Sequence, residues 1–229
     1  MTVPAAGPGR AAPPPGLSFR PFTEGDVPAC GRLARDAWPA GPGIASRETE
    51  LAGMEGYVGY SLGSSNWGEV ACTDGGIAGF LLGRIDGLPG GPPPERGVLG
   101  EVPSMLASAL GDEHRPRLLG FLWSLALTEV KVRLNTPASD ASVEMFIVGS
   151  GSRGKGVGTA LLERFLEAAR GAGASSVTVY TDELMSNWRF YEGRGFRRVA
   201  SFHDNITSHY SGSPSRGFVF ALDLRVQKG

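Results

Sequence analysis

The sequence predicts a mixed α/β (α+β) domain whose central sheet of six to seven strands is flanked by helices. Three observations predict this fold. A short apolar run at Val143–Val148 leads through a glycine-rich loop into a helix pattern that reaches Arg170, which is a strand, a loop and a helix in succession. The pair Asp74-Gly75 separates two apolar runs, as in a hairpin. Strand and helix patterns also alternate along the rest of the chain.

The first half of the chain begins with a segment, residues 1–16, that has no large apolar residue after Val3 and is predicted to be a disordered tail. A single domain is predicted from 17 to 229, since 229 residues build one core and hardly two. Its first elements are a strand, a helix that begins near Thr23, a second helix and the two strands of the hairpin. Their predicted ranges are 17–22, 23–37, 47–62, 67–73 and 76–85.

The segment 87–141 is predicted to be a helical insertion before the strand that starts at Val143. It opens with Pro and Gly residues and holds a weak helical pattern at 102–110 and a strong one at 117–134. The strong pattern is apolar on most faces, so it needs cover from the core or from another subunit. A homodimer is therefore one alternative for the assembly.

The second half of the chain continues with three more strands and one more helix. The β-branched run at 176–180 predicts a strand, and 184–194 predicts a short helix that ends at Gly195. The strand 196–202, a polar loop at 203–216 and the strand 217–224 complete the prediction.

Composition excludes several classes of function. The chain has 22 basic and 23 acidic residues and a net charge of −1, so no nucleic-acid-binding surface is expected. Cys30 and Cys72 lack zinc-ligand spacing, and no metal site is predicted. The apolar stretch 118–127 is too short to cross a bilayer, and no apolar leader is seen. We therefore expect a cytoplasmic protein that does not bind membranes.

The glycine loop between 149 and 158 matches three phosphate-binding patterns. Gly149 to Gly154 spells the dinucleotide pattern G-x-G-x-x-G, and Gly149 to Lys155 spells the P-loop pattern G-x-x-x-x-G-K without its final Ser or Thr. Gly156 stands where the P-loop needs a hydroxyl for magnesium. A dinucleotide fold would place the loop on its first strand, whereas here it follows 148 residues. The third pattern is R-x-x-G-x-G, from Arg153 to Gly158.

A second motif lies one strand further on, with Asn187, Tyr191, Gly195 and Phe196 in the pattern N…(F/L)-Y-E-x-x-G-F. The two motifs, in this order, resemble those of the GNAT superfamily of acyl-CoA N-acyltransferases. The resemblance covers Val143–Phe202 well, and the residues before it only by pattern. One departure is that this family often has an asparagine seven residues before the tyrosine, where Leu184 stands here.

The resemblance implies acetyl-CoA as cosubstrate and a set of residues that bind it. Backbone NH groups of the loop would hold the pyrophosphate, with added charge from Arg153 and Lys155. The strand would pair with the pantetheine amides, and an NH near Ile147 or Val148 would polarise the acetyl carbonyl. The implied residues are Phe146, Ile147, Val148, Arg153, Gly154, Lys155, Gly156, Val157, Gly158, Thr159, Asn187 and Tyr191.

The implied reaction is acyl transfer from acetyl-CoA to a small-molecule or peptide primary amine by direct attack, because no cysteine lies near the motifs. Tyr191 matches the family's proton donor to the CoA thiolate. Glu144 is the leading base, and strand alternation predicts that it shares a face with Phe146 and Val148. A second choice of base comes from His203, Asp204 or His209.

Two other functions stay open at this point. One is an acyl-CoA-binding sensor or interaction module without turnover. The other is a P-loop nucleotide-binding protein in which Asp182 would help to bind magnesium. The acceptor is expected to be chosen by the loop 38–46, the insertion 87–141 and the loop 203–216.

Overall fold

The computed structural model describes residues 16–39, 46–89 and 115–225. The predicted tail, the helical pattern at 102–110 and parts of the insertion and of the 38–46 loop lie outside these residues. All further statements concern the described part of the chain.

The predicted sheet is confirmed, with seven strands in the order β1-β2-β3-β4-β5-β7-β6. β4 and β5 are parallel, and the other neighbouring strands are antiparallel. The strands are β1 (Ser18–Pro21), β2 (Trp67–Thr73), β3 (Gly76–Ile85), β4 (Ala141–Val148), β5 (Ser176–Asp182), β6 (Arg197–His203) and β7 (Arg216–Asp223).

The two parallel strands separate along their length. β4 pairs with β3 as far as Val148, but it pairs with β5 only from Ala141 to Val143. The residues from Glu144 to Val148 therefore have a strand partner on one side only. This open edge of β4 lies in the middle of the sheet.

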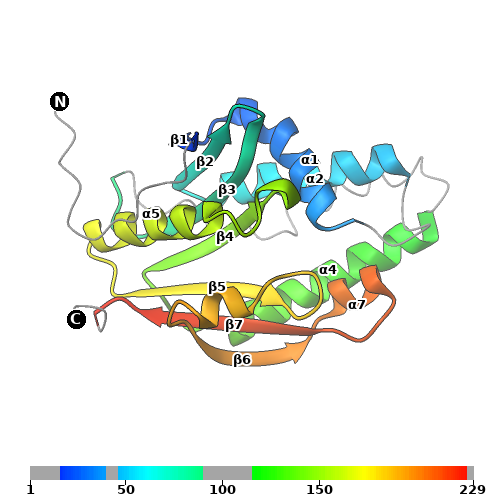
Figure 1. Ribbon diagram of the computed structural model, residues 1–229. Helices are drawn as coiled ribbons and strands as arrows, with labels where there is room; N and C mark the ends of the chain where they lie inside the picture. Colours follow the sequence, from blue (N-terminus) through cyan, green and yellow to red (C-terminus); the bar gives the residue numbers. More distant parts are fainter. Residues whose placement is uncertain (1–15, 40–45, 90–114, 226–229) are drawn as a thin grey trace.

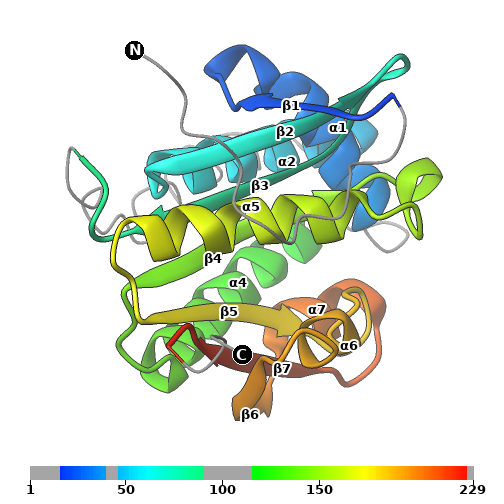
Figure 2. The same ribbon diagram turned by 60° about the vertical axis from the view of Figure 1, so that its left-hand side comes forward.

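Helices cover both faces of the sheet. Figures 1 and 2 show α5 on one face, with α6 beside it, and α1, α2 and α4 on the other. The helices are η1 (Glu24–Asp26), α1 (Val27–Ala37), α2 (Arg47–Gly63), α4 (Arg115–Asn135), η3 (Ser150–Ser152), α5 (Val157–Gly171), α6 (Arg189–Glu192) and α7 (Asn205–Ser211).

Each face has its own apolar core, as helix and strand periodicity predict. On one face α5 buries a stripe that includes Leu161 and Phe165, which are 0% exposed, against the sheet. On the other face Cys30 of α1 and Val58 of α2, also 0% exposed, pack on Phe80 of β3. The sheet is thus a partition between two hydrophobic layers.

The chain enters α1 through η1, whose N-cap Thr23 forms a capping box with Asp26. The Thr23 amide donates to Asp26 Oδ2 at 2.9 Å, and the Arg20 guanidinium binds both carboxylate oxygens at 2.7 and 2.6 Å. The regular helix begins only at Val27, so Pro28 falls in its first turn, where its missing N–H costs nothing.

Helix α4, which corresponds to the strong helical pattern predicted at 117–134, reaches across to β6, β7 and α7. The buried Asp204 carboxylate holds it there by accepting hydrogen bonds from Thr128 Oγ1 at 3.2 Å and from the Tyr180 hydroxyl of β5 at 2.8 Å. Thr128 Oγ1 in turn accepts the Asn205 amide at 3.1 Å. On its opposite side α4 exposes Leu119, Trp123, Val130 and Leu134.

Two predicted elements need correction. The predicted helix at 184–194 is helical only from Arg189 to Glu192, because the Asp182 carboxylate accepts the amides of Leu184 and Met185 and holds that segment in a turn. The predicted polar loop 203–216 contains a helix, α7, whose N-cap Asp204 accepts the Thr207 amide at 3.1 Å.

Candidate active site

A β-bulge in β4 directs the side chains around the open edge. Leu82 of β3 faces Met145, but the next residue, Gly83, faces Val143, so Glu144 is the extra residue. Phe146 and Val148 pack with the α5 core, whereas Met145 and Ile147 pack with the α1 and α2 core. The bulge places Glu144 on the α2 side, where it interacts with Tyr57 and Tyr60.

The expectation that Glu144 shares a face with Phe146 and Val148 is therefore wrong. Strand alternation holds only without a bulge, and a bulge shifts every later residue by one face. The carboxylate and the two apolar side chains lie on opposite sides of the sheet.

A cleft of about 1180 Å³ passes through the sheet at this point. It is lined on the α5 side by the glycine loop, Phe190 and Arg194, on the far side by residues of α2 and α4, and between them by the open edge of β4. Ten of the predicted cofactor-binding residues line it: Phe146, Ile147, Val148, Arg153, Gly154, Gly156, Gly158, Thr159, Asn187 and Tyr191.

The other predicted residues lie elsewhere. Lys155 is exposed and Val157 is buried in the α5 core, and neither lines the cleft. Of the alternative bases, Asp204 is fully buried in its hydrogen bonds to α4 and β5, His203 is exposed, and the ring centroid of His209 lies 6.3 Å from that of Phe121. None of these three lines the cleft.

The glycine loop has a backbone shape suited to an anion. Gly154 and Gly156 have φ of 73° and 79°, a left-handed conformation that other residues adopt at a cost. Gly156 is the N-cap of α5, so the first-turn amides of this 15-residue helix face the loop without intrahelical partners. Arg153 lies beside them and donates from Nε to the Val148 carbonyl at 3.1 Å.

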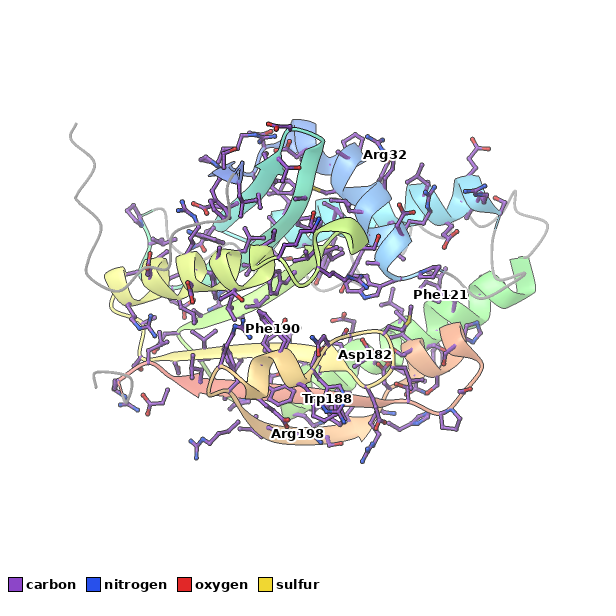
Figure 3. All side chains as sticks on the ribbon, in the orientation of Figure 1. Arg32, Phe121, Asp182, Trp188, Phe190 and Arg198 are labelled. Carbon is purple, nitrogen blue, oxygen red and sulfur yellow. The ribbon has the colours of Figure 1, made fainter. Side chains whose placement is uncertain are left out.

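Gly158 allows a close approach of α5 to β4 and α6. A Cβ atom there would lie 3.3 Å from Val148 Cγ2 and 3.4 Å from Phe146 Cζ. Phe190 completes this contact, with its ring centroid 5.7 Å from that of Phe146, and Figure 3 shows it between α6 and α5. A side chain at 158 would narrow the cleft.

The open edge of β4 presents the amides of alternate residues. The Gly149 amide donates to the Ala78 carbonyl of β3 at 2.9 Å. Because amides two residues apart point the same way along a strand, the Ile147 amide also faces β3, whereas the amides of Phe146 and Val148 face the cleft. Ile147 and Val148 are the two predicted candidates for polarising the acetyl carbonyl, and only the Val148 amide points into the cleft.

Tyr191 lies at the wall of the cleft on α6, 7% exposed. Its ring packs against Phe196 and Phe220, with centroids 5.6 and 6.1 Å away. Burial raises the pKa of its phenol, so the hydroxyl keeps its proton at any physiological pH. It is a proton donor held at the edge of an apolar core.

Glu144 accepts a hydrogen bond from the Ser142 hydroxyl at 2.5 Å. Burial raises the pKa of its carboxyl, while Ser142 and the Arg84 guanidinium lower it. A carboxylate whose pKa is raised is a better base than an exposed glutamate.

Sequence reasoning missed three residues of the cleft. Arg194 lies over the Phe190 ring at 3.7 Å and donates to the Thr159 hydroxyl, which places a second guanidinium beside the start of α5. Tyr57 and Glu129 line the opposite side. Arg194 lies within the second motif and could have been found. The segment 87–141, which contains α4, was expected to choose the acceptor, but the sequence singles out neither Glu129 in it nor Tyr57 of α2.

A seven-stranded mixed sheet opened beside a glycine loop defines a CoA-binding α/β protein. The model of the Acetyltransferase (GNAT) family matches residues 31–196, so the chain belongs to that family. The protein is an N-acetyltransferase that uses acetyl-CoA, as the sequence predicts. No curated protein matches significantly.

Solved structures share the fold at low sequence identity. One is the ribosomal-protein-S18-alanine N-acetyltransferase from Escherichia coli, with 13% identity, a TM-score of 0.52 and coverage of 91% of this chain and 94% of that one. Another is yncA from Salmonella typhimurium, solved with its cofactor acetyl-CoA, with 15% identity, a TM-score of 0.51 and coverage of 93% and 97%.

The described residues contain neither a metal-ligand cluster nor a membrane-spanning helix. They include no group of three or more His, Cys, Asp or Glu side chains that could hold a metal ion. No helix among them has the length and apolar character needed to cross a membrane.

Proposed function

We propose that this protein moves an acetyl group from acetyl-CoA to a primary amine by direct attack, with Tyr191 as the acid and Glu144 as the base. One observation carries the proposal. The cleft leads from the glycine loop, past Tyr191 and the open edge of β4, to Glu144 on the opposite side of the sheet.

The α5 side of the cleft fits the donor. The first-turn amides of α5 and the Arg153 guanidinium suit a pyrophosphate, and Arg194 adds a further charge. The edge of β4 from Phe146 to Val148 offers backbone groups to the pantetheine amides, as an added strand would use them. Bound acetyl-CoA supplies the acetyl thioester, whose carbonyl oxygen accepts from the Val148 amide.

The residues around the thioester account for each proton. Glu144 removes a proton from the acceptor ammonium, and the free amine attacks the carbonyl carbon. A C–N bond forms and the C–S bond breaks with its electron pair on sulfur, which takes the proton of Tyr191. The new amide nitrogen then gives its surplus proton to the Tyr191 oxygen, so the phenol is restored.

Direct attack is supported by the position of the cysteines. Cys30 is fully buried in the core under α1, where burial raises the pKa of its thiol to about 12, and neither Cys30 nor Cys72 lines the cleft. No described cysteine is placed to carry the acetyl group.

The test is release of thiol from acetyl-CoA across a panel of amines, amino acids and peptides. Tyr191→Phe keeps the ring packing and should lower kcat by about 10²-fold or more while the KM for acetyl-CoA stays the same. CoA binding without turnover of any acceptor above the hydrolysis background would refute the proposal. Stabilisation by magnesium-ATP rather than by acetyl-CoA would refute the assignment of the loop.

A further inference from the structure

The acceptor side of the cleft is built by α2 and by α4, which lies within the segment 87–141 that is expected from the sequence to choose the acceptor. Glu129 comes from α4, in the insertion, and lines the cleft together with Ala126 and Arg133, which lie one turn before and after it on the same helix face. Glu144 faces this helix from the bulge in β4, and its negative charge raises the pKa of Glu129. The two carboxyl groups belong to one site.

The negative charge of this pair is only partly compensated. Glu129 accepts no hydrogen bond and forms no ion pair with the described residues, and Glu144 is bound only by the Ser142 hydroxyl. The nearby Arg84 guanidinium is shared with Asp86, 2.5 Å away. Arg133 lies one turn further along α4 and is exposed. A half-buried carboxyl pair of this kind attracts a cation.

Aromatic rings form the wall beside the two carboxyl groups. Trp38 and Tyr57 have ring centroids 6.5 Å apart, and Tyr57 stacks on Tyr60 at 6.3 Å with an interplanar angle of 11°. All three residues line the cleft. Burial and the charge of Glu129 raise the pKa of Tyr57, so its phenol stays neutral. Aromatic faces and carboxylates together suit an organic cation with an apolar body.

We propose that the acceptor is a primary amine without a carboxylate group, bound with its ammonium between Glu129 and Glu144 and its apolar part against Trp38, Tyr57 and Tyr60. This inference rests on the proposed function and names its substrate class. A carboxylate on the acceptor would lie close to two carboxyl groups of the protein, so α-amino acids are disfavoured.

Glu129 and Glu144 share the acceptor's proton. The ammonium loses one N–H bond, and one O–H bond forms on a carboxylate of the pair. Since burial and the charge of Glu144 raise the pKa of Glu129 to about 7, the pair can take this proton near neutral pH and release it to water after the transfer.

The test compares amines that differ only by a carboxylate: tyramine with tyrosine, cadaverine with lysine, and agmatine with arginine. We expect kcat/KM, measured by thiol release, to be at least about 30-fold higher for the decarboxylated partner in one pair or more. Equal or faster transfer to the amino acid overturns the inference. So does a protein that acetylates only amino acids or peptides, although the proposed function would then stand.

Glu129→Gln tests the residue itself. It should raise the KM for the preferred amine about 10-fold or more and remove the step near pH 7 from its pH profile, with an unchanged KM for acetyl-CoA. The matched control is Glu167→Gln, an exposed change on α5 outside the cleft. It should leave the KM for the amine, the KM for acetyl-CoA and the pH profile unchanged. The inference is overturned if Glu129→Gln binds CoA but has the same KM for the amine and the same pH profile as the wild type.

Discussion

Replacing Glu129 by Gln should make the protein more stable, and the gain should depend on pH. Burial, and then the charge of Glu144, raise the pKa of Glu129 from 4.5 to about 7. Between these values the folded protein holds a proton that the unfolded chain has lost, so stability falls as pH rises through this window. At about 1.36 kcal/mol per pH unit the penalty above pH 7 is at most about 3 kcal/mol.

The neutral glutamine does not carry this penalty. Denaturant unfolding of wild type and variant should give equal free energies near pH 4.5 and a gain of about 1–3 kcal/mol for the variant at pH 8.5, a rise in Tm of roughly 2–12 °C. The exposed Glu167→Gln change serves as the control at both pH values. A variant no more stable than wild type at pH 8.5 would refute the claim that Glu129 is held in an unfavourable site.

Three other changes test separate parts of the structure. Gly158→Ala should raise the KM for acetyl-CoA about 10-fold without loss of stability, because its Cβ would meet Val148 and Phe146, whereas Gly151→Ala, whose Cβ meets nothing within 4 Å, should not. Asp204→Ala should lower the free energy of unfolding, measured in urea, by about 3 kcal/mol and raise the KM for the acceptor, because Tyr180 and Thr128 lose their buried partner. Tyr180→Phe should lower the free energy of unfolding by only about 1 kcal/mol. Asp26→Asn should make the free energy of unfolding less dependent on pH in acid. Since Arg20 lowers the pKa of Asp26 to about 2, the free energy of unfolding of the wild type should fall by about 1–2 kcal/mol between about pH 4 and pH 2. The same fall in the variant would contradict this.

The succession of strands along the chain and the donor side of the site could be predicted from the sequence because their signals are local, whereas the order of strands in the sheet was not predicted. The Asp74-Gly75 turn, the apolar runs and the glycine loop each specify a short segment. Helix α7 was missed although Asp204, its N-cap, was visible in the sequence.

The acceptor side could not be predicted because it depends on contacts between distant segments. Strand alternation put Glu144 on the wrong face, since it takes no account of a bulge. Gly83, inside an apolar run opposite the bulge, was the available signal, and a Cβ there would lie 2.4 Å from the Phe165 ring. For Glu129, α4 had first to be placed against α7, and that contact spans 76 residues from Thr128 to Asp204.

In the proposed reaction, the single extra residue in β4 also separates the binding places of the two substrates. Because Phe146 and Val148 lie toward one face and Glu144 toward the other, the proposed reaction has acetyl-CoA on the α5 side of the sheet and the amine on the α2 and α4 side. We therefore expect that both substrates can be bound at once and that the acetylated product can leave while CoA is still in place. The α2 and α4 walls can therefore change to suit a new amine without alteration of the CoA half.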